Sequence, residues 1–147
     1  MSSELLGIKV NEIMRTEDIP LVERSDPIKE IMPFPHGSSH AWVLEGGGSK
    51  KVVGVVTEHD ILTILAPDKP AYIVGFPDMR TLCADCPIGD IMTREIIETK
   101  PDERLDDALR KITKHRISCL PVLDKDGEIV GEIHKTSITD RLSDEFG

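Results

Sequence analysis

The chain repeats itself, and this internal duplication constrains its fold more than any other feature. Two pairs of segments carry the repeat: Val10-Asn11-Glu12-Ile13-Met14 with Ile88-Gly89-Asp90-Ile91-Met92, and Val53-Gly54-Val55-Val56-Thr57 with Val130-Gly131-Glu132-Ile133-His134. The offset between them is nearly constant, since Gly54 and Gly131 are 77 residues apart and Val43 and Val122 are 79 apart. Related units of this kind stack and bury a shared core. We therefore expect a pseudo-twofold arrangement with any ligand bound between the repeats.

Composition limits the class of protein. The 147 residues are 39% hydrophobic and 31% charged, which is typical of a globular protein large enough for one core or two small ones. No apolar run approaches the ~20 residues of a membrane span, and the start of the chain lacks a secretory pattern. We therefore expect a cytoplasmic location and no membrane partner. The net charge of −9 argues against nucleic-acid binding, which requires Lys and Arg to replace phosphate counterions.

Each repeat predicts the order strand, helix, strand, strand, helix, which gives an α+β fold built from two such units. In the first repeat we expect strands over residues 19–22, 41–44 and 52–56, a helix opened by Asp26-Pro27 that ends near Met32, and a helix over 58–65. In the second repeat we expect strands over 96–99, 120–123 and 129–133, a turn over 124–127, and helices that begin near Leu105 and at Lys135. The predicted domains are residues 1–65 and 88–147, joined by a linker over 66–87 whose apolar residues 71–74 predict that it packs on the body.

These patterns resemble the tandem cystathionine-β-synthase-type (CBS) domain pair, or Bateman module. The resemblance covers residues 10–62 and 88–140, and its most specific pieces are residues 119–131 and 53–62. It implies a regulatory, non-catalytic module that binds AMP, ADP, ATP, S-adenosylmethionine or NAD between its units. It also implies a homodimer and a separate effector protein, which the sequence does not identify.

The family's ligand motif, Gly-h-x-Thr/Ser-x-x-Asp, is complete in the first repeat as Gly54, Thr57 and Asp60. By resemblance, Asp60 accepts hydrogen bonds from both ribose hydroxyls and Thr57 contacts phosphate. A carboxylate suits a vicinal diol because it only accepts hydrogen bonds. The same Thr-x-x-Asp is also the pattern of a helix capping box, in which both side chains only satisfy free backbone N–H groups.

The remaining candidate ligand contacts surround this motif. The basic candidates are His40 and His59, for which a half-exposed surface histidine is an equal alternative. In the second repeat His134 and Ser137 replace Thr57 and Asp60, which predicts a weaker or differently specialised cleft. The apolar walls and remaining positions are Pro20, Ala41, Val55, Ile97, Cys119, Leu120 and Pro121.

Two other hypotheses stay open. One is a protein-interaction scaffold with vestigial clefts, favoured by the degenerate second motif. The other is a thiol or metal sensor through Cys83-Ala84-Asp85-Cys86, although a zinc site prefers four ligands and ordinary thiols are the simpler interpretation. No nucleophile elbow, Walker loop or His-Glu-x-x-His motif is present, so we predict no enzyme and no metal.

Overall fold

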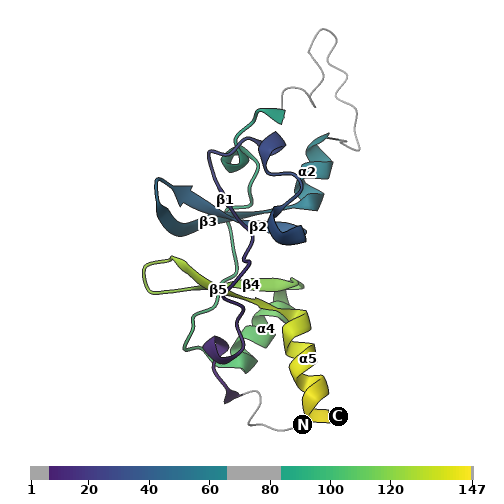
Figure 1. The fold of residues 1–147 in the computed structure, drawn as a ribbon. Coiled ribbons are helices and arrows are strands. Elements are labelled where there is room, and N and C mark those ends of the chain that lie inside the picture. Colours follow the sequence, from purple (N-terminus) through teal and green to yellow (C-terminus); the bar gives the residue numbers. More distant parts are fainter. Residues whose placement is uncertain (1–6, 66–83, 147) are drawn as a thin grey trace. The chain divides into compact units, whose positions relative to one another are not determined.

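The computed structural model describes residues 7–65 and 84–146 (Figure 1). The chain divides into two compact units: a central unit of residues 20–96, and a terminal unit made of residues 1–19 and 97–147. The division predicted from the sequence follows the repeats. The compact units differ from the repeats. The opening segment of each repeat packs in the unit that contains the rest of the other repeat.

The central unit contains a three-stranded sheet in the order β1 (Leu21–Glu23), β2 (His40–Gly46) and β3 (Ser49–Thr57). β1 runs parallel to β2, and β3 runs antiparallel to it. The chain then enters helix α2 (Glu58–Leu65) directly. The sheet residues Val22, Val43 and Val56 belong to a buried cluster that also holds Ile61 of α2 and Ile88, the first residue of the 3-10 turn η4 (Ile88–Asp90).

The helix predicted after Asp26-Pro27 is wrong. The segment forms only the 3-10 turn η2 (Ile28–Glu30), with Pro27 and not Asp26 at its N-cap position. Asp26 Oδ2 instead accepts a hydrogen bond from the backbone N–H of Glu23 at 2.9 Å, which closes a turn after β1. A second 3-10 turn, η3 (Pro35–Gly37), follows, since prolines at 33 and 35 cannot continue a helix interior.

The terminal unit differs from the central unit in having a full first helix and a two-stranded sheet. It contains η1 (Val10–Glu12), helix α4 (Leu105–His115), strands β4 (Cys119–Leu123) and β5 (Ile129–His134), and helix α5 (Lys135–Phe146). Both helices lie on one side of the antiparallel β4–β5 pair (Figure 1). The apolar stripe of α4 buries Leu105, Ala108 and Ile112 in a cluster with residues of β4, β5 and α5.

Most predicted elements are confirmed. Helix α2 has the predicted bounds, and the four core strands extend the predicted ranges by one to three residues at an end. Gly127 has a φ of 80°, as expected of a tight turn between β4 and β5. The strand predicted over 96–99 is reduced to one parallel bridge between Thr99 and Val122. The predicted packing of residues 71–74 lies outside the described residues.

Equivalent hydrogen bonds close both units around the exchanged segments. In the central unit, Val55 and Thr93 exchange both backbone bonds at 2.9 Å, and Ile88 N–H donates to the carbonyl of Asp26 at 2.8 Å. In the terminal unit, Glu132 and Arg15 exchange both bonds at 2.9 Å. The opening segment of each repeat thus forms one antiparallel bridge with the last strand of the unit that it joins.

Candidate functional site

The predicted motif of the first repeat lies where β3 runs into α2. The backbone N–H of Thr57 donates to Asp60 Oδ2 at 3.0 Å, and the backbone N–H of Asp60 donates to Thr57 Oγ1 at 3.2 Å. These reciprocal bonds form a capping box, with Thr57 at the N-cap and Asp60 three residues later. Among the residues that the structure describes, the Asp60 carboxylate makes no other hydrogen bond. One of its oxygens caps the helix, and the second is available to a ligand.

His40 lies beside this motif. It is the direct partner of Thr57 in the β2–β3 register, and only 7% of its surface is exposed. Its Nδ1 is 2.9 Å from Ser38 Oγ, and its ring packs edge-on against Trp42 with ring centroids 5.2 Å apart. His40 is therefore a buried, held side chain and not a half-exposed surface histidine. His59 is exposed on α2, as its alternative interpretation predicted.

The predicted apolar walls divide into two groups. The side chains of Ala41 and Leu120 are fully buried inside the cores of their units. They offer a ligand only backbone atoms. Val55 and Ile97 are partly exposed, and Pro20 and Pro121 are buried. Pro20 also fixes the start of β2, because its carbonyl accepts a hydrogen bond from the backbone N–H of Trp42 at 2.9 Å.

In the terminal unit, Cys119 and His134 face each other in the β4–β5 register, as His40 and Thr57 do in the central unit. Ser137 is partly exposed on α5. Burial, and secondarily the nearby Glu132 carboxylate, raise the pKa of the Cys119 thiol to about 12. This thiol stays protonated at neutral pH.

Glu132 was not predicted as a site residue, and it is the most unusual residue of the β4–β5 pair. Its side chain is fully buried, and its Oε1 lies 2.5 Å from His134 Nε2 and 3.9 Å from Arg15 Nη2. A buried carboxylate is costly unless it is hydrogen-bonded and paired. The signal that points to it is the repeat itself, because the equivalent residue of the first repeat is the apolar Val55.

A family model for the CBS domain matches residues 10–67 and 88–144, which together cover most of the chain. The chain belongs to the CBS domain family. Both matched stretches begin with the segments that the compact units exchange.

Two curated relatives of this CBS pair differ in how much of their own length the match covers. It is 30% identical over 170 aligned positions to an uncharacterized protein of Methanocaldococcus jannaschii, MJ1426, and the match covers 97% of this chain and 99% of that one. It is 27% identical to the inosine-5'-monophosphate dehydrogenase of Nitrosopumilus maritimus. That match covers 94% of this chain but only 25% of the dehydrogenase, so the chain spans about a quarter of that relative's length.

Solved structures share the fold of this CBS pair. CBSX2, solved in complex with AMP, superposes with a TM-score of 0.74 at 19% identity over 96% of this chain and 100% of that one. The CBS domain pair of MJ0100, solved with 5'-methylthioadenosine and S-adenosylmethionine, gives a TM-score of 0.70 at 24% identity over 94% and 98% of the two chains. The predicted architecture of two CBS units is confirmed.

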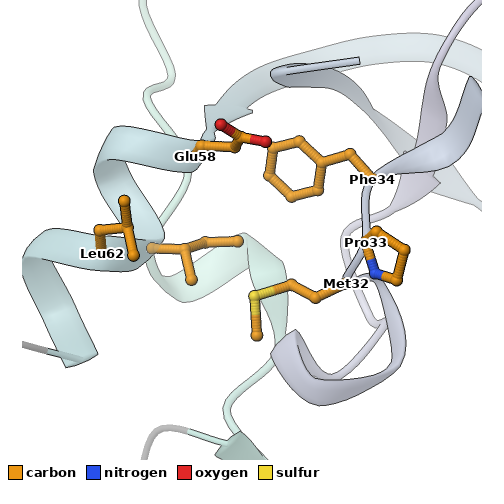
Figure 2. A pocket seen from close by; sticks show the side chains of 6 residues that line it. Met32, Pro33, Phe34, Glu58 and Leu62 are labelled. Atoms are coloured by element: carbon orange, nitrogen blue, oxygen red, sulfur yellow. The ribbon is translucent and has the colours of Figure 1, made fainter. Parts of the chain in front are cut away.

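The central unit of the CBS pair also carries an apolar pocket of about 300 Å³ between α2 and the segment before β2. Figure 2 shows Met32, Pro33 and Phe34 on one wall and Glu58 and Leu62 on the other. Met32 is 41% exposed and Leu62 is 61% exposed. These two are the exposed large hydrophobic side chains of the described residues.

Of the two linker cysteines named for a thiol or metal sensor, the structure describes Cys86 alone. Cys86 is partly buried against the core of the central unit, and Cys83 lies outside the described residues. Asp85, between them, forms an exposed ion pair with Lys29 at 2.5 Å. None of the helices in residues 7–65 and 84–146 has the length and apolarity of a membrane span.

Proposed function

We propose that this CBS pair is a regulatory, non-catalytic sensor of an adenosine-containing ligand, with its ribose anchor at Asp60. The observation that carries the proposal is the state of the Asp60 carboxylate. One oxygen is held by the backbone of Thr57, which fixes the orientation of the group, while the other makes no hydrogen bond within the described part of the chain. A fixed carboxylate with an available oxygen suits the two hydroxyl donors of a ribose.

The neighbours of Asp60 fit the rest of such a ligand. Thr57 and the first N–H groups of α2 lie at the positive end of a helix dipole, which favours a phosphate. His40, opposite Thr57 in the sheet, adds an imidazole that can donate a hydrogen bond. CBSX2 was solved with AMP, and the CBS domain pair of MJ0100 with 5'-methylthioadenosine and S-adenosylmethionine, so we expect the ligand of this chain among such adenosine compounds.

Regulation requires more than binding. A ligand shifts an equilibrium only when it binds two arrangements of the protein with different affinity. We propose that an effector protein, or a further part of a longer polypeptide, responds to that shift. The effector remains an expectation from the family resemblance, and the cytoplasmic location remains an expectation from the sequence pattern.

Calorimetric titration tests the proposal. The protein is first unfolded and refolded to remove carried ligand, and is then titrated with AMP, ADP, ATP, S-adenosylmethionine and NAD. We expect saturable binding of at least one ligand, lost in Asp60→Ala and retained in the matched variant Ser137→Ala of the second repeat. Binding that survives Asp60→Ala would move the anchor away from the first repeat, and the absence of binding to folded protein would contradict the sensor.

The second candidate function is protein interaction. The exposed side chains of Met32 and Leu62 favour it, because large hydrophobic side chains that gather at one surface pocket often mark contact sites. A homodimer is the partner that the family resemblance implies. Sedimentation of the wild type and Leu62→Glu tests this function: a lower oligomeric state in the variant, with unchanged ligand titrations, would favour an interaction role for this surface.

A further inference from the structure

We propose that Arg24, Ser25 and Arg94 form a binding site for a small phosphate anion, either inorganic phosphate or the phosphate group of a small ester. These residues line a pocket of about 260 Å³ in the central unit. That volume lies just below the ~300–1,000 Å³ of sites that hold drug-sized ligands, so the pocket suits a small anion better than a whole nucleotide. The site goes beyond the sensor proposed above and does not depend on it.

The pocket lies at the opposite end of the sheet from the Thr57–Asp60 motif. Thr57 pairs with His40 at the start of β2. Arg24 follows β1, and its backbone N–H donates to the carbonyl of Leu44, near the end of β2, at 3.0 Å. The four strand positions from His40 to Leu44 span about 13 Å at ~3.3 Å per residue. A small phosphate in this pocket is therefore out of reach of the motif.

Backbone hydrogen bonds hold both arginines in place. The N–H of Gly89 donates to the carbonyl of Arg24 at 2.8 Å, and a Cβ added to Gly89 would lie 3.1 Å from that oxygen. Glycine thus lets the η4 turn lie directly against Arg24. Arg94 follows Thr93, which exchanges both backbone bonds with Val55 at 2.9 Å. Two arginines far apart in sequence are therefore brought to one pocket on fixed backbone, which lowers the cost of ordering them around a ligand.

The polar side chains of the pocket are available to a ligand. Both arginines are exposed, and no carboxylate of residues 7–65 and 84–146 forms an ion pair with either of them. The hydroxyl of Ser25 makes no hydrogen bond within the same ranges. By contrast, Arg110 on α4 pairs with both Asp106 and Asp107. A guanidinium stays charged and binds phosphate oxygens through paired N–H donors, so two unpaired guanidiniums and a hydroxyl suit a phosphate.

One carboxylate limits the charge that the pocket accepts. Asp90 also lines it, and this side chain forms no ion pair with a described residue. The two arginines outnumber the carboxylate, so the lining keeps an excess of positive charge. That balance suits a single phosphate group and disfavours a polyphosphate, because the repulsion from Asp90 grows with the charge of the ligand. Removal of the Asp90 charge should therefore strengthen phosphate binding.

Titration with inorganic phosphate, followed through the amide NMR signals of the full refolded chain, tests the site. Sodium chloride keeps the ionic strength constant, because salt screens exposed charges. We expect saturable binding with a Kd on the order of 1 mM, and the largest shifts at the amides of Ser25, Gly89 and Arg94. Glycerol phosphate is titrated in parallel. Tighter binding of this ester identifies a phosphate ester as the ligand class, and equal or weaker binding identifies the free anion.

Substitutions in the pocket test the role of each charge. Arg24→Gln and Arg94→Gln should each weaken phosphate binding about tenfold, and Asp90→Asn should strengthen it. Arg141→Gln is the matched control, because Arg141 is an exposed arginine of α5 that forms no ion pair with a described residue. It should leave the Kd unchanged. All four positions are exposed, so the variants are expected to fold, and circular dichroism checks that they do.

The proposal is overturned if the folded wild type shows no saturable binding of phosphate, or if folded Arg24→Gln and Arg94→Gln bind it as the wild type does. It is also overturned if the NMR shifts are confined to Thr57 and the first residues of α2, since phosphate would then occupy the helix start beside Asp60. The adenosine titrations of Asp60→Ala test the sensor separately, so failure of one proposal is distinguishable from failure of the other.

Discussion

The side chain of Met92 occupies the space that a side chain at Gly54 would need. A Cβ added to Gly54 would lie 2.7 Å from Met92 Sδ and 2.8 Å from the carbonyl oxygen of Thr93. The same relationship joins Gly131 and Met14 in the terminal unit, at 2.6 Å. Gly54 and Gly131 thus allow the exchanged segments to approach the edges of their sheets closely.

This close approach predicts that Gly54→Ala destabilises the central unit by about 1–3 kcal/mol. The methionine can move, but the carbonyl of Thr93 is held by its bonds to Val55. The free energy of unfolding in urea measures the effect. Gly7→Ala is the matched control, because the nearest atom to its added Cβ is a flexible guanidinium nitrogen at 3.7 Å. A Gly54→Ala protein as stable as Gly7→Ala would contradict the packing described.

Replacement of the buried Thr99 by valine is predicted to stabilise the protein. Its side chain is fully buried, and within the described residues its hydroxyl has no hydrogen-bond partner. An unsatisfied buried hydroxyl costs about 1–3 kcal/mol. Thr99→Val keeps the shape, and valine is the residue found at the equivalent position, Val22. We expect unfolding free energy to rise by about 1 kcal/mol, whereas Thr113→Val on the exposed side of α4 should change it little. A loss of stability in Thr99→Val would show that the hydroxyl is satisfied.

The two roles of Asp60 can be separated by Asp60→Asn. Asparagine keeps one oxygen to cap α2, so the unfolding free energy should fall by less than about 1 kcal/mol. It also puts an amide donor against ribose hydroxyls, so affinity for an adenosine ligand should fall about tenfold or more. Thr57→Ala is the companion variant, since it removes a cap acceptor and should cost about 1 kcal/mol of stability. If the free energy of binding fell by no more than the free energy of unfolding in Asp60→Asn, only the capping role of Asp60 would be supported.

The raised pKa of the Cys119 thiol predicts that the folded protein loses stability as the pH rises above 9. Its folded pKa of about 12 exceeds the unfolded value of 9.0, so above pH 9 the unfolded chain releases a proton that the folded chain keeps. The stabilising contribution is complete below pH 9 and declines by about 1.4 kcal/mol per pH unit up to pH 12. Unfolding free energies of the wild type and Cys119→Ser between pH 8 and 11 should converge. Parallel curves would show that the thiol titrates normally.

Local patterns predicted the elements of this fold well. The apolar stripe of α4 and the Thr-x-x-Asp start of α2 are encoded by neighbours in sequence, and both helices form where those patterns begin. The exchanged segments were not predicted, because the bonds from Ile88 to Asp26 and from Arg15 to Glu132 join residues tens of positions apart. Nothing in the local sequence specifies which repeat will receive each segment.

The candidate site was predicted only where its residues are neighbours in sequence. The motif at Thr57 and Asp60 is local, and its capping geometry is present as the sequence allows. Glu132 was missed because a charged residue in an alternating strand normally indicates the solvent face. Its burial depends on tertiary packing, which overrides the pattern. Ala41 and Leu120 show the converse, since a strand residue named for a pocket wall points into a core.

The exchange of opening segments makes each compact unit depend on both repeats. A single CBS repeat, if made as a separate chain, would lack the bridge that Arg15 or Thr93 supplies and the methionine that covers Gly131 or Gly54. Two such chains would complete each other by trading their first residues. The duplicated chain holds both partners in one polypeptide, so this reciprocal pairing does not depend on protein concentration.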